Sequence, residues 1–94
     1  MPQLVRIGDA VAPHSDFAGS VMATGSTKVF IQGVGACRVG DISTVHCNPY
    51  SCHIGTDIVG STKILIEGSP ALLVGDSLDC GAVVIGGSSK VTGN

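Results

Sequence analysis

The sequence predicts a small all-β fold, with little or no helix, in which three copies of one β-hairpin unit surround a pseudo-threefold axis. The first observation is a repeat: residues 25–41 (GSTKVFIQGVGACRVGD) and 60–76 (GSTKILIEGSPALLVGD) are identical at ten of seventeen positions, 35 residues apart. A fixed period of this size indicates one repeated supersecondary unit. The second is composition, since 14 glycines among 94 residues and 3% aromatic residues suit short strands joined by tight turns.

The repeat continues beyond its two full copies. A Gly-Asp step occurs at 8–9, 40–41 and 75–76, with spacings of 32 and 35 residues, and the GSTK opening returns in altered form as GSSKV at 87–91. The unit therefore begins midway at one terminus and ends midway at the other, which is a circularly permuted threefold repeat. We expect one domain spanning residues 1–94.

Each copy is predicted to form a hairpin. Val29 and Ile31 alternate with Lys28, Phe30 and Gln32, and the same period of two recurs over 63–67, as in a half-buried strand rich in β-branched residues. We expect a turn at Val34-Gly35 and at Ser69-Pro70, followed by a second strand. A single hairpin is marginal in water, so three should bury their apolar faces against one another. A β-solenoid fits poorly because no six-residue apolar repeat can be traced, and a short helical turn within 44–54 is left open.

Metal-ligating residue types recur after the Gly-Asp steps. His14 lies five positions after Asp9, His46 lies five after Asp41, and Cys80 lies four after Asp76. A threefold axis would bring these three side chains together. His53, the remaining histidine, lies in the long 42–59 connection and can supply a fourth ligand.

Three imidazoles and one thiolate form a tetrahedral donor set that suits Zn²⁺. A structural zinc ion contributes roughly 10–16 kcal/mol of apparent binding free energy in small peptides, and a domain of this size often needs such a staple. Three alternatives stay open. Cys47 or Cys52 could replace one histidine, these two cysteines could form a disulfide, or the histidines could be unrelated surface residues.

The remaining polar repeat residues predict scaffold rather than catalysis. Aspartate after glycine is a turn residue whose carboxylate accepts backbone N–H bonds, so Asp9, Asp41 and Asp76 are interpreted as structural. Glu67 aligns with Gln32, which argues against an essential acid, and Cys37 aligns with Leu72 and should be a small buried hydrophobe. Since no nucleophile with a dedicated base stands out, we expect a protein that is not an enzyme.

Charge and hydropathy exclude several classes of function. The net charge is −2 and the five lysines and arginines are scattered, whereas nucleic-acid binding depends on clustered cations. The apolar runs fall far short of the roughly 20 residues of a membrane span. The N-terminal MPQLVRIGD lacks the apolar segment of a secretory signal peptide.

The pattern GS-x-x-V/I-x-I-x-G, the following x-A-x-x-V-G-D, and a His or Cys beyond each Gly-Asp resemble the PAAR-repeat family. These are the small proteins that sharpen the spikes of contractile injection machines. The resemblance covers nearly the whole chain, although the Pro-Ala-Ala-Arg motif itself is degraded to Ser-Pro-Ala-Leu at 69–72 and Gly-Ala-Cys-Arg at 35–38.

The resemblance implies a pointed β-cone with one structural Zn²⁺ near its apex, held by His14, His46, His53 and Cys80. It implies that one copy sits on a trimeric β-helical spike, of the VgrG type or of a phage tail, and transiently contacts the target membrane. Such a tip is made in the bacterial cytoplasm without a signal peptide and is ejected on the spike. We expect a bare tip with no fused cargo, or an adaptor that carries separate effectors. The competing functions are a small zinc hydrolase and a free-standing metal-binding protein.

Overall fold

The computed structural model describes residues 2–14 and 17–93, and this part of the chain forms antiparallel β-hairpins and turns without a helix. It therefore contains no helix long and apolar enough to cross a bilayer. The eight strands pair as β1–β2, β3–β4, β5–β6 and β7–β8. Their bounds are Ala10–Val11, Ser20–Val21, Phe30–Ile31, Val34–Gly35, His46–Cys47, Cys52–His53, Leu65–Ile66 and Ser69–Pro70. The predicted all-β fold is confirmed.

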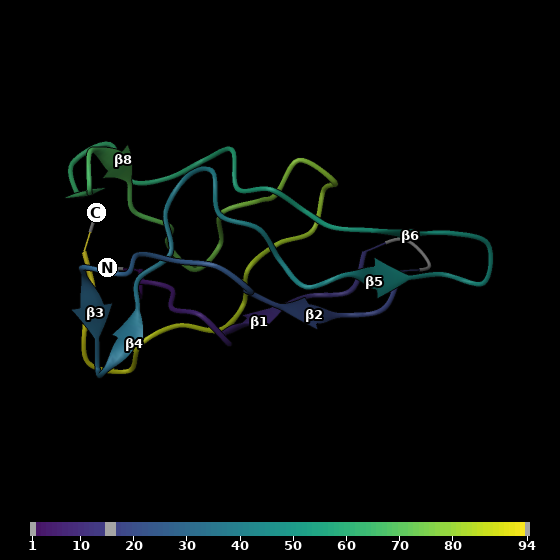
Figure 1. Cartoon of the computed structure of the whole chain (residues 1–94), viewed down its shortest axis with the longest axis horizontal. Coiled ribbons are helices and arrows are strands. Elements are labelled where there is room, and N and C mark those ends of the chain that lie inside the picture. The colour runs from purple at the N-terminus through teal and green to yellow at the C-terminus, as the bar shows by residue number, and fades with distance from the viewer. Residues whose placement is uncertain (1, 15–16, 94) are drawn as a thin grey trace.

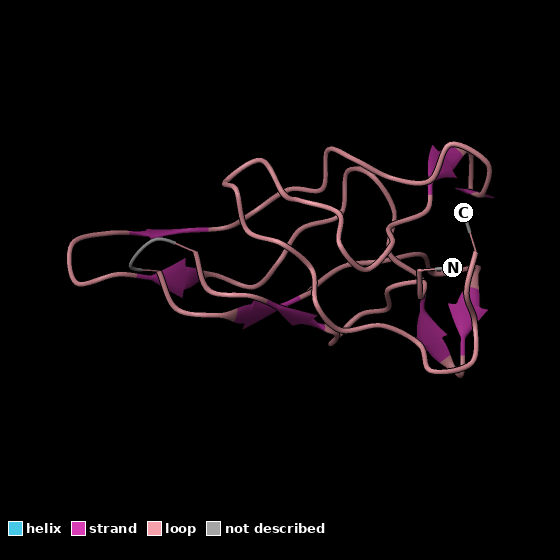
Figure 2. Ribbon diagram, turned by 180° about the vertical axis from the view of Figure 1, so that it is seen from behind, coloured by secondary structure: helices cyan, strands magenta, loops and turns pink. Residues whose placement is uncertain are grey.

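The molecule is elongated and tapers from one end to the other. Its principal extents are 37 × 24 × 22 Å. The β3–β4 hairpin, the β8 strand and both chain ends gather at the broad end, which we call the base, whereas β5 and β6 lie at the narrow end, the tip (Figure 1). The view from behind shows the same separation, with the β1–β2 pair and loops in the region between (Figure 2).

A ring of backbone hydrogen bonds demonstrates the pseudo-threefold axis. The N–H of Val5 donates to the carbonyl of Leu72 (3.1 Å), that of Leu72 to Cys37 (3.0 Å), and that of Cys37 back to Val5 (2.9 Å). These three residues occupy the same position in the three copies, and all are fully buried. The copies therefore surround a common axis, and Cys37 is a core residue, as predicted.

The two termini together complete the third copy. Gln3 pairs with Thr92 in an antiparallel bridge, at the position that corresponds to the first pair of β3–β4 and of β7–β8. This pairing confirms the circularly permuted repeat.

The predicted hairpin turns are wrong by two residues. Val34–Gly35 and Ser69–Pro70 are strands β4 and β8, and the turns lie at Gln32-Gly33 and Glu67-Gly68. The φ angles are 52° and 80° in the first turn and 51° and 83° in the second. Both central residues are left-handed, as in the two-residue turns whose twist matches antiparallel strands. The stretches that follow pair between copies instead, as in the bridge of Arg38 with Ala71.

The Gly-Asp steps form tight turns with a fixed role for the carboxylate. The glycines have φ angles of 91°, 100° and 99°, which L side chains rarely adopt. Each aspartate accepts a hydrogen bond from the backbone N–H three residues earlier: Arg6 to Asp9 (2.7 Å), Arg38 to Asp41 (2.9 Å) and Leu73 to Asp76 (2.9 Å). The structural interpretation of these aspartates agrees with this geometry.

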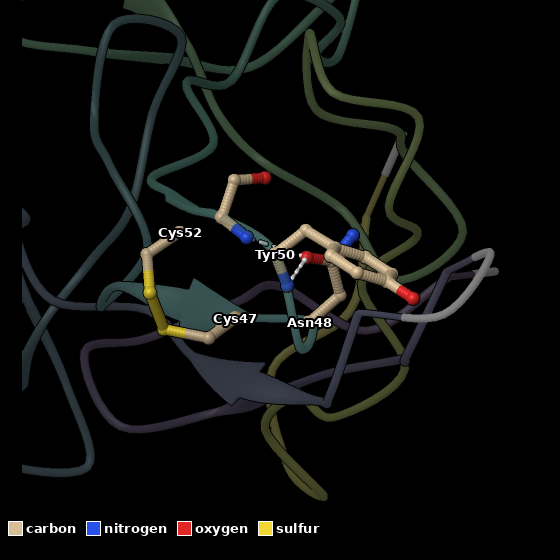
Figure 3. The surroundings of a disulfide bond; sticks show 5 residues. Cys47, Asn48, Tyr50 and Cys52 are labelled. Atoms are coloured by element: carbon tan, nitrogen blue, oxygen red, sulfur yellow. Dashed lines mark hydrogen bonds between the residues drawn. A yellow bond between two sulfur atoms is a disulfide. The ribbon is translucent and has the colours of Figure 1, made fainter.

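The 44–54 segment forms the β5–β6 hairpin and not a helical turn. Asn48 Oδ1 accepts hydrogen bonds from the N–H groups of Tyr50 (2.8 Å) and Ser51 (2.7 Å), which closes the loop over 48–51. A disulfide joins Cys47 to Cys52 below that loop (Figure 3). The side chain of asparagine competes with helical hydrogen bonding by satisfying nearby backbone groups, which accounts for the difference.

Candidate metal centre

Three loops of unequal length, here called excursions, form the tip, one from each copy of the repeat. Each excursion is closed at its start and end by an equivalent backbone pairing. These pairings are β1 with β2, the N–H of Ser43 with the carbonyl of Gly55 (2.8 Å), and the N–H of Leu78 with the carbonyl of Ala82 (2.8 Å). The first excursion, 11–20, carries His14. The second, 43–55, contains the β5–β6 hairpin with His46 and His53, and the shortest, 78–82, carries Cys80.

The structure brings all four predicted ligand residues together. His14 Nε2 lies 3.1 Å from His46 Nε2 and 3.1 Å from His53 Nε2. Cys80 Sγ lies 3.8 Å from His46 Nε2. The four donor atoms all lie within 4.8 Å of one another, and the group is buried or half-buried.

These separations fit a tetrahedral metal site. Zinc–nitrogen bonds of about 2.0–2.1 Å and a zinc–sulfur bond of about 2.3 Å place tetrahedral donors roughly 3.3–3.6 Å apart. Hydrogen bonding alone explains the cluster poorly. A neutral imidazole has one donor and one acceptor nitrogen, so one proton cannot satisfy His14 Nε2 toward both neighbouring Nε2 atoms. A shared cation satisfies all of them.

His46 is oriented for ligation by a second contact. Its Nδ1 lies 3.1 Å from Ser20 Oγ on β2. When Nδ1–H donates to this hydroxyl, the lone pair of Nε2 faces the other donors, as in metal sites whose histidines are held by outer hydrogen bonds. Burial, and then the neighbouring His53 and His14, lower the pKa of His46. The neutral, metal-binding form is thereby favoured.

An aromatic side chain shields the cluster. The ring of Phe17 stacks on His14, with centroids 5.0 Å apart and planes at 15°, and it lies 4.1 Å from the ring of His53. Sequence reasoning missed Phe17 because it lies in an excursion without a counterpart of equal length, and Ser20 because the equivalent positions carry Gly55 and Ala82. The available signal was their proximity to His14 within the first excursion.

A glycine allows Cys80 to reach the cluster. A Cβ atom on Gly55 would lie 2.5 Å from Leu78 Cδ2 and 3.0 Å from Cys80 Sγ. Contacts this short would require the neighbours to move, so position 55, at the end of the second excursion, must carry no side chain. The sequence did not reveal this role either.

The remaining cysteines are not part of the donor group. Cys47 and Cys52 pair with each other in the β5–β6 ladder, one rung from the pair His46 and His53. Successive side chains of a strand point to opposite faces, so the disulfide lies on the side away from the histidines. The donors that converge are those of His14, His46, His53 and Cys80.

Three imidazoles and a thiolate converge at the narrow end of a pseudo-threefold β-cone, as a group that could hold a metal ion. The family model of the PAAR motif matches residues 11–86. The chain therefore belongs to the PAAR-motif family, a structural family associated with the spike tips of contractile injection systems. A search of curated proteins found no significant match.

Proposed function

We propose that this chain caps a trimeric β-helical spike of a contractile injection machine, one copy per trimer, with its base on the spike and its metal-bearing tip pointing outward. The observation that carries the proposal is the pseudo-threefold base opposite the four-donor cluster. One chain with three similar sectors presents a related surface to each subunit of a threefold trimer, so a single copy matches the symmetry of its partner.

Exposed apolar side chains on the base support this docking mode. Phe30 on β3 and Leu65 on β7 occupy equivalent positions and are 58% and 63% exposed. The third equivalent, Thr92, is exposed and polar. Apolar side chains are exposed at the tip as well, so the support comes from the equivalent places of Phe30 and Leu65 in two of the three sectors of the base.

We further propose that the tip holds one Zn²⁺ through His14, His46, His53 and Cys80. Four protein donors close the coordination sphere, which is the pattern of structural zinc sites, whereas catalytic sites keep an open position. The bound ion would tie the three excursions to one another. This donor set favours a structural role over the hydrolase alternative.

The machine would deliver the protein mechanically. The tip would be ejected with the spike toward a target envelope, touch its membrane briefly, and act as a bare point or an adaptor for separate effectors. Spikes of the VgrG type and of phage tails are both compatible partners.

Co-purification of the full chain with a trimeric β-helical spike fragment tests the docking proposal. The double variant F30D/L65D should lose the spike because it places charge on the base, whereas Y50A at the tip should retain it. Tyr50 is a matched control because it is 91% exposed at the opposite end of the molecule. Failure of the wild-type chain to bind, or equal binding by the base variant, would refute the assignment.

A further inference from the structure

The disulfide and two of the metal ligands occupy adjacent rungs of one short ladder. In β5–β6, His46 pairs with His53 and Cys47 pairs with Cys52. The Cys47–Cys52 bond closes a loop with a sequence separation of five. Its two cysteines are exposed, while His46 is buried and His53 half-buried on the other face.

The hairpin itself contributes little to its own stability. Val45 and Ile54 flank the ladder and are 61% and 48% exposed, and Tyr50 in the loop is 91% exposed. A two-stranded hairpin without a buried apolar face is marginal in water. On the loop side of His53, the Cys47–Cys52 bond is therefore a principal constraint on the position of the second strand.

The first strand is anchored to the neighbouring excursion. The carbonyl of Cys47 accepts from Ala18 N–H (3.1 Å), and Thr44 N–H donates to the carbonyl of Val21 (2.8 Å). The second strand, which carries His53, is held at its end by the pairing of Gly55 with Ser43 and on one side by the ring of Phe17. Toward the loop it is held by its ladder with β5 and by the disulfide. The link from Cys47 to Cys52 therefore helps to fix where His53 stands relative to His46.

We propose that the Cys47–Cys52 disulfide is a redox-dependent positioning link for the metal centre: its formation tightens metal binding, and metal binding makes the disulfide harder to reduce. The two effects are equal because coupling between two sites is reciprocal. Formation converts two thiols to one disulfide, and two electrons and two protons pass to a disulfide-bearing oxidant by thiol–disulfide exchange. The inference rests on the proposed metal site and is independent of the spike partner.

This coupling would give the tip two states. In a reducing compartment the donors would be held less firmly and metal would exchange faster. Once the thiols are oxidised, the disulfide would hold His46 and His53 at the separation that a shared metal ion needs. Metal binding would then have to order fewer side chains. Preorganisation of this kind raises affinity by lowering the ordering cost.

The test compares metal affinity in the full chain in three forms: oxidised wild type, wild type reduced with a phosphine, and the double variant C47S/C52S. Co²⁺ serves as the probe because its visible absorption reports tetrahedral nitrogen and sulfur coordination, and Zn²⁺ is then measured by competition. We expect the same Co²⁺ spectrum in all forms and a Kd about 5- to 100-fold weaker without the disulfide, a usual range for coupled sites. Y50A, which keeps the disulfide, should bind as the wild type does.

The reciprocal measurement is the midpoint of disulfide reduction in glutathione buffers with and without Zn²⁺. Each tenfold effect on affinity should lower the reduction potential by about 30 mV. Equal affinity in all three forms, or equal midpoints, would overturn the coupling while leaving the metal site intact. Tighter binding by the reduced wild type than by C47S/C52S, with an altered spectrum, would also overturn it because a freed thiolate would then be a ligand. Failure of the oxidised protein to bind either ion would refute the metal site itself.

Discussion

At the scale of single residues, Asp57 is a carboxylic acid in an otherwise apolar core position. The bridges of Met22 with Ser43, Asp57 with Leu78 and Val84 with Val11 are equivalent in the three copies. Asp57 therefore stands where the other copies place Met22 and Val84, and it is 1% exposed. Both carboxylate oxygens lack a hydrogen-bond partner among the described residues.

Burial, and then the nearby carboxylates of Asp41, Asp76 and Asp79, together raise the pKa of Asp57 to about 8. Because the folded state holds this proton more tightly than the unfolded state, whose pKa is near 3.8, the free energy of unfolding falls as pH rises from about 4 to about 8. The fall can approach about 1.4 kcal/mol per pH unit.

We predict that D57N and D57L flatten this slope between pH 6 and pH 8, and that D57L is the more stable of the two. Leucine restores the apolar character of the equivalent positions, whereas asparagine leaves a buried amide to satisfy. Denaturant unfolding of the metal-loaded protein at several pH values measures the slope. A wild-type stability that is constant over this range would contradict the assignment.

Gly55 gives a second prediction at the residue scale. In G55A the new methyl would press on Leu78 and Cys80, so we expect a loss of about 1–3 kcal/mol from overpacking together with weaker metal binding. L78V removes the contacting Cδ2 atom and should recover part of both losses in the double variant. If G55A kept the wild-type stability and Co²⁺ affinity, the prediction would be wrong, because the second excursion would then have shifted to accommodate the methyl group without loss.

The convergence of the four candidate ligands could be predicted from sequence because three of them stand at equivalent places in a repeat. Phe17 could not be predicted in this way because it lies within a tip excursion whose length differs from the others, so the repeat gives no alignment for it. Ser20 and Gly55 do occupy equivalent positions at the ends of their excursions, together with Ala82, but three different residue types stand there, so the repeat did not mark them. Asp57 does lie in the repeat frame, and its alignment with two apolar residues was a readable signal.

At the scale of elements, the turns of the base hairpins brace one copy against the next. Gln32 Oε1 accepts from Arg6 Nη1 (3.0 Å) and from Ser88 Oγ (2.7 Å). Glu67 Oε2 accepts from Ser26 Oγ (2.8 Å) and pairs with Arg38. The hydrogen bond from Ser26, and then Arg38, lower the pKa of Glu67.

The similarity of the two braces predicts the effect of changing Glu67. E67Q should unfold at nearly the wild-type temperature, since Gln32 already makes the same pair of contacts with a neutral amide. E67A should unfold a few degrees lower because it removes the acceptor while keeping a non-glycine residue at the left-handed turn position. Thermal unfolding at low and high salt measures both variants. An E67Q variant as unstable as E67A would mean that the charge, and not the hydrogen bonding, holds the brace.

The hairpins were predictable as elements, but their turns were not. Glycine at 33 and 68 marked a turn, yet Val34-Gly35 and Ser69-Pro70 carry equally strong turn residues. The choice depends on Gln32 and Glu67 adopting left-handed φ angles. Contacts from the neighbouring copy satisfy these two side chains, so the decisive interactions lie outside the hairpin.

At the scale of the whole molecule, the metal should connect the tip to the threefold core. Removing it with a chelator, or substituting alanine for His14 or Cys80, should lower the free energy of unfolding by at least about 3 kcal/mol. For a domain of this size that corresponds to roughly 12–24 °C. Chelation should have no further effect on C80A if that variant no longer binds metal. An unfolding temperature unchanged by chelation would rule out a stabilising ion.

The threefold architecture was predictable because each copy repeats both a turn signature and a core position. The repeat unit is split between the two ends of the sequence, and the pairing of Gln3 with Thr92 follows from that split. The residues proposed to face the spike were not predictable from the repeat, since exposure of Phe30 and Leu65 depends on how the hairpins project from the base.

The central claim is that one metal-tied chain caps one trimeric spike. Native mass spectrometry of the purified complex measures both stoichiometries at once. We predict three spike subunits, one copy of this chain and one Zn²⁺ in a single species. A complex with three copies of the chain, a complex without metal, or no complex with the trimeric spike would contradict the account.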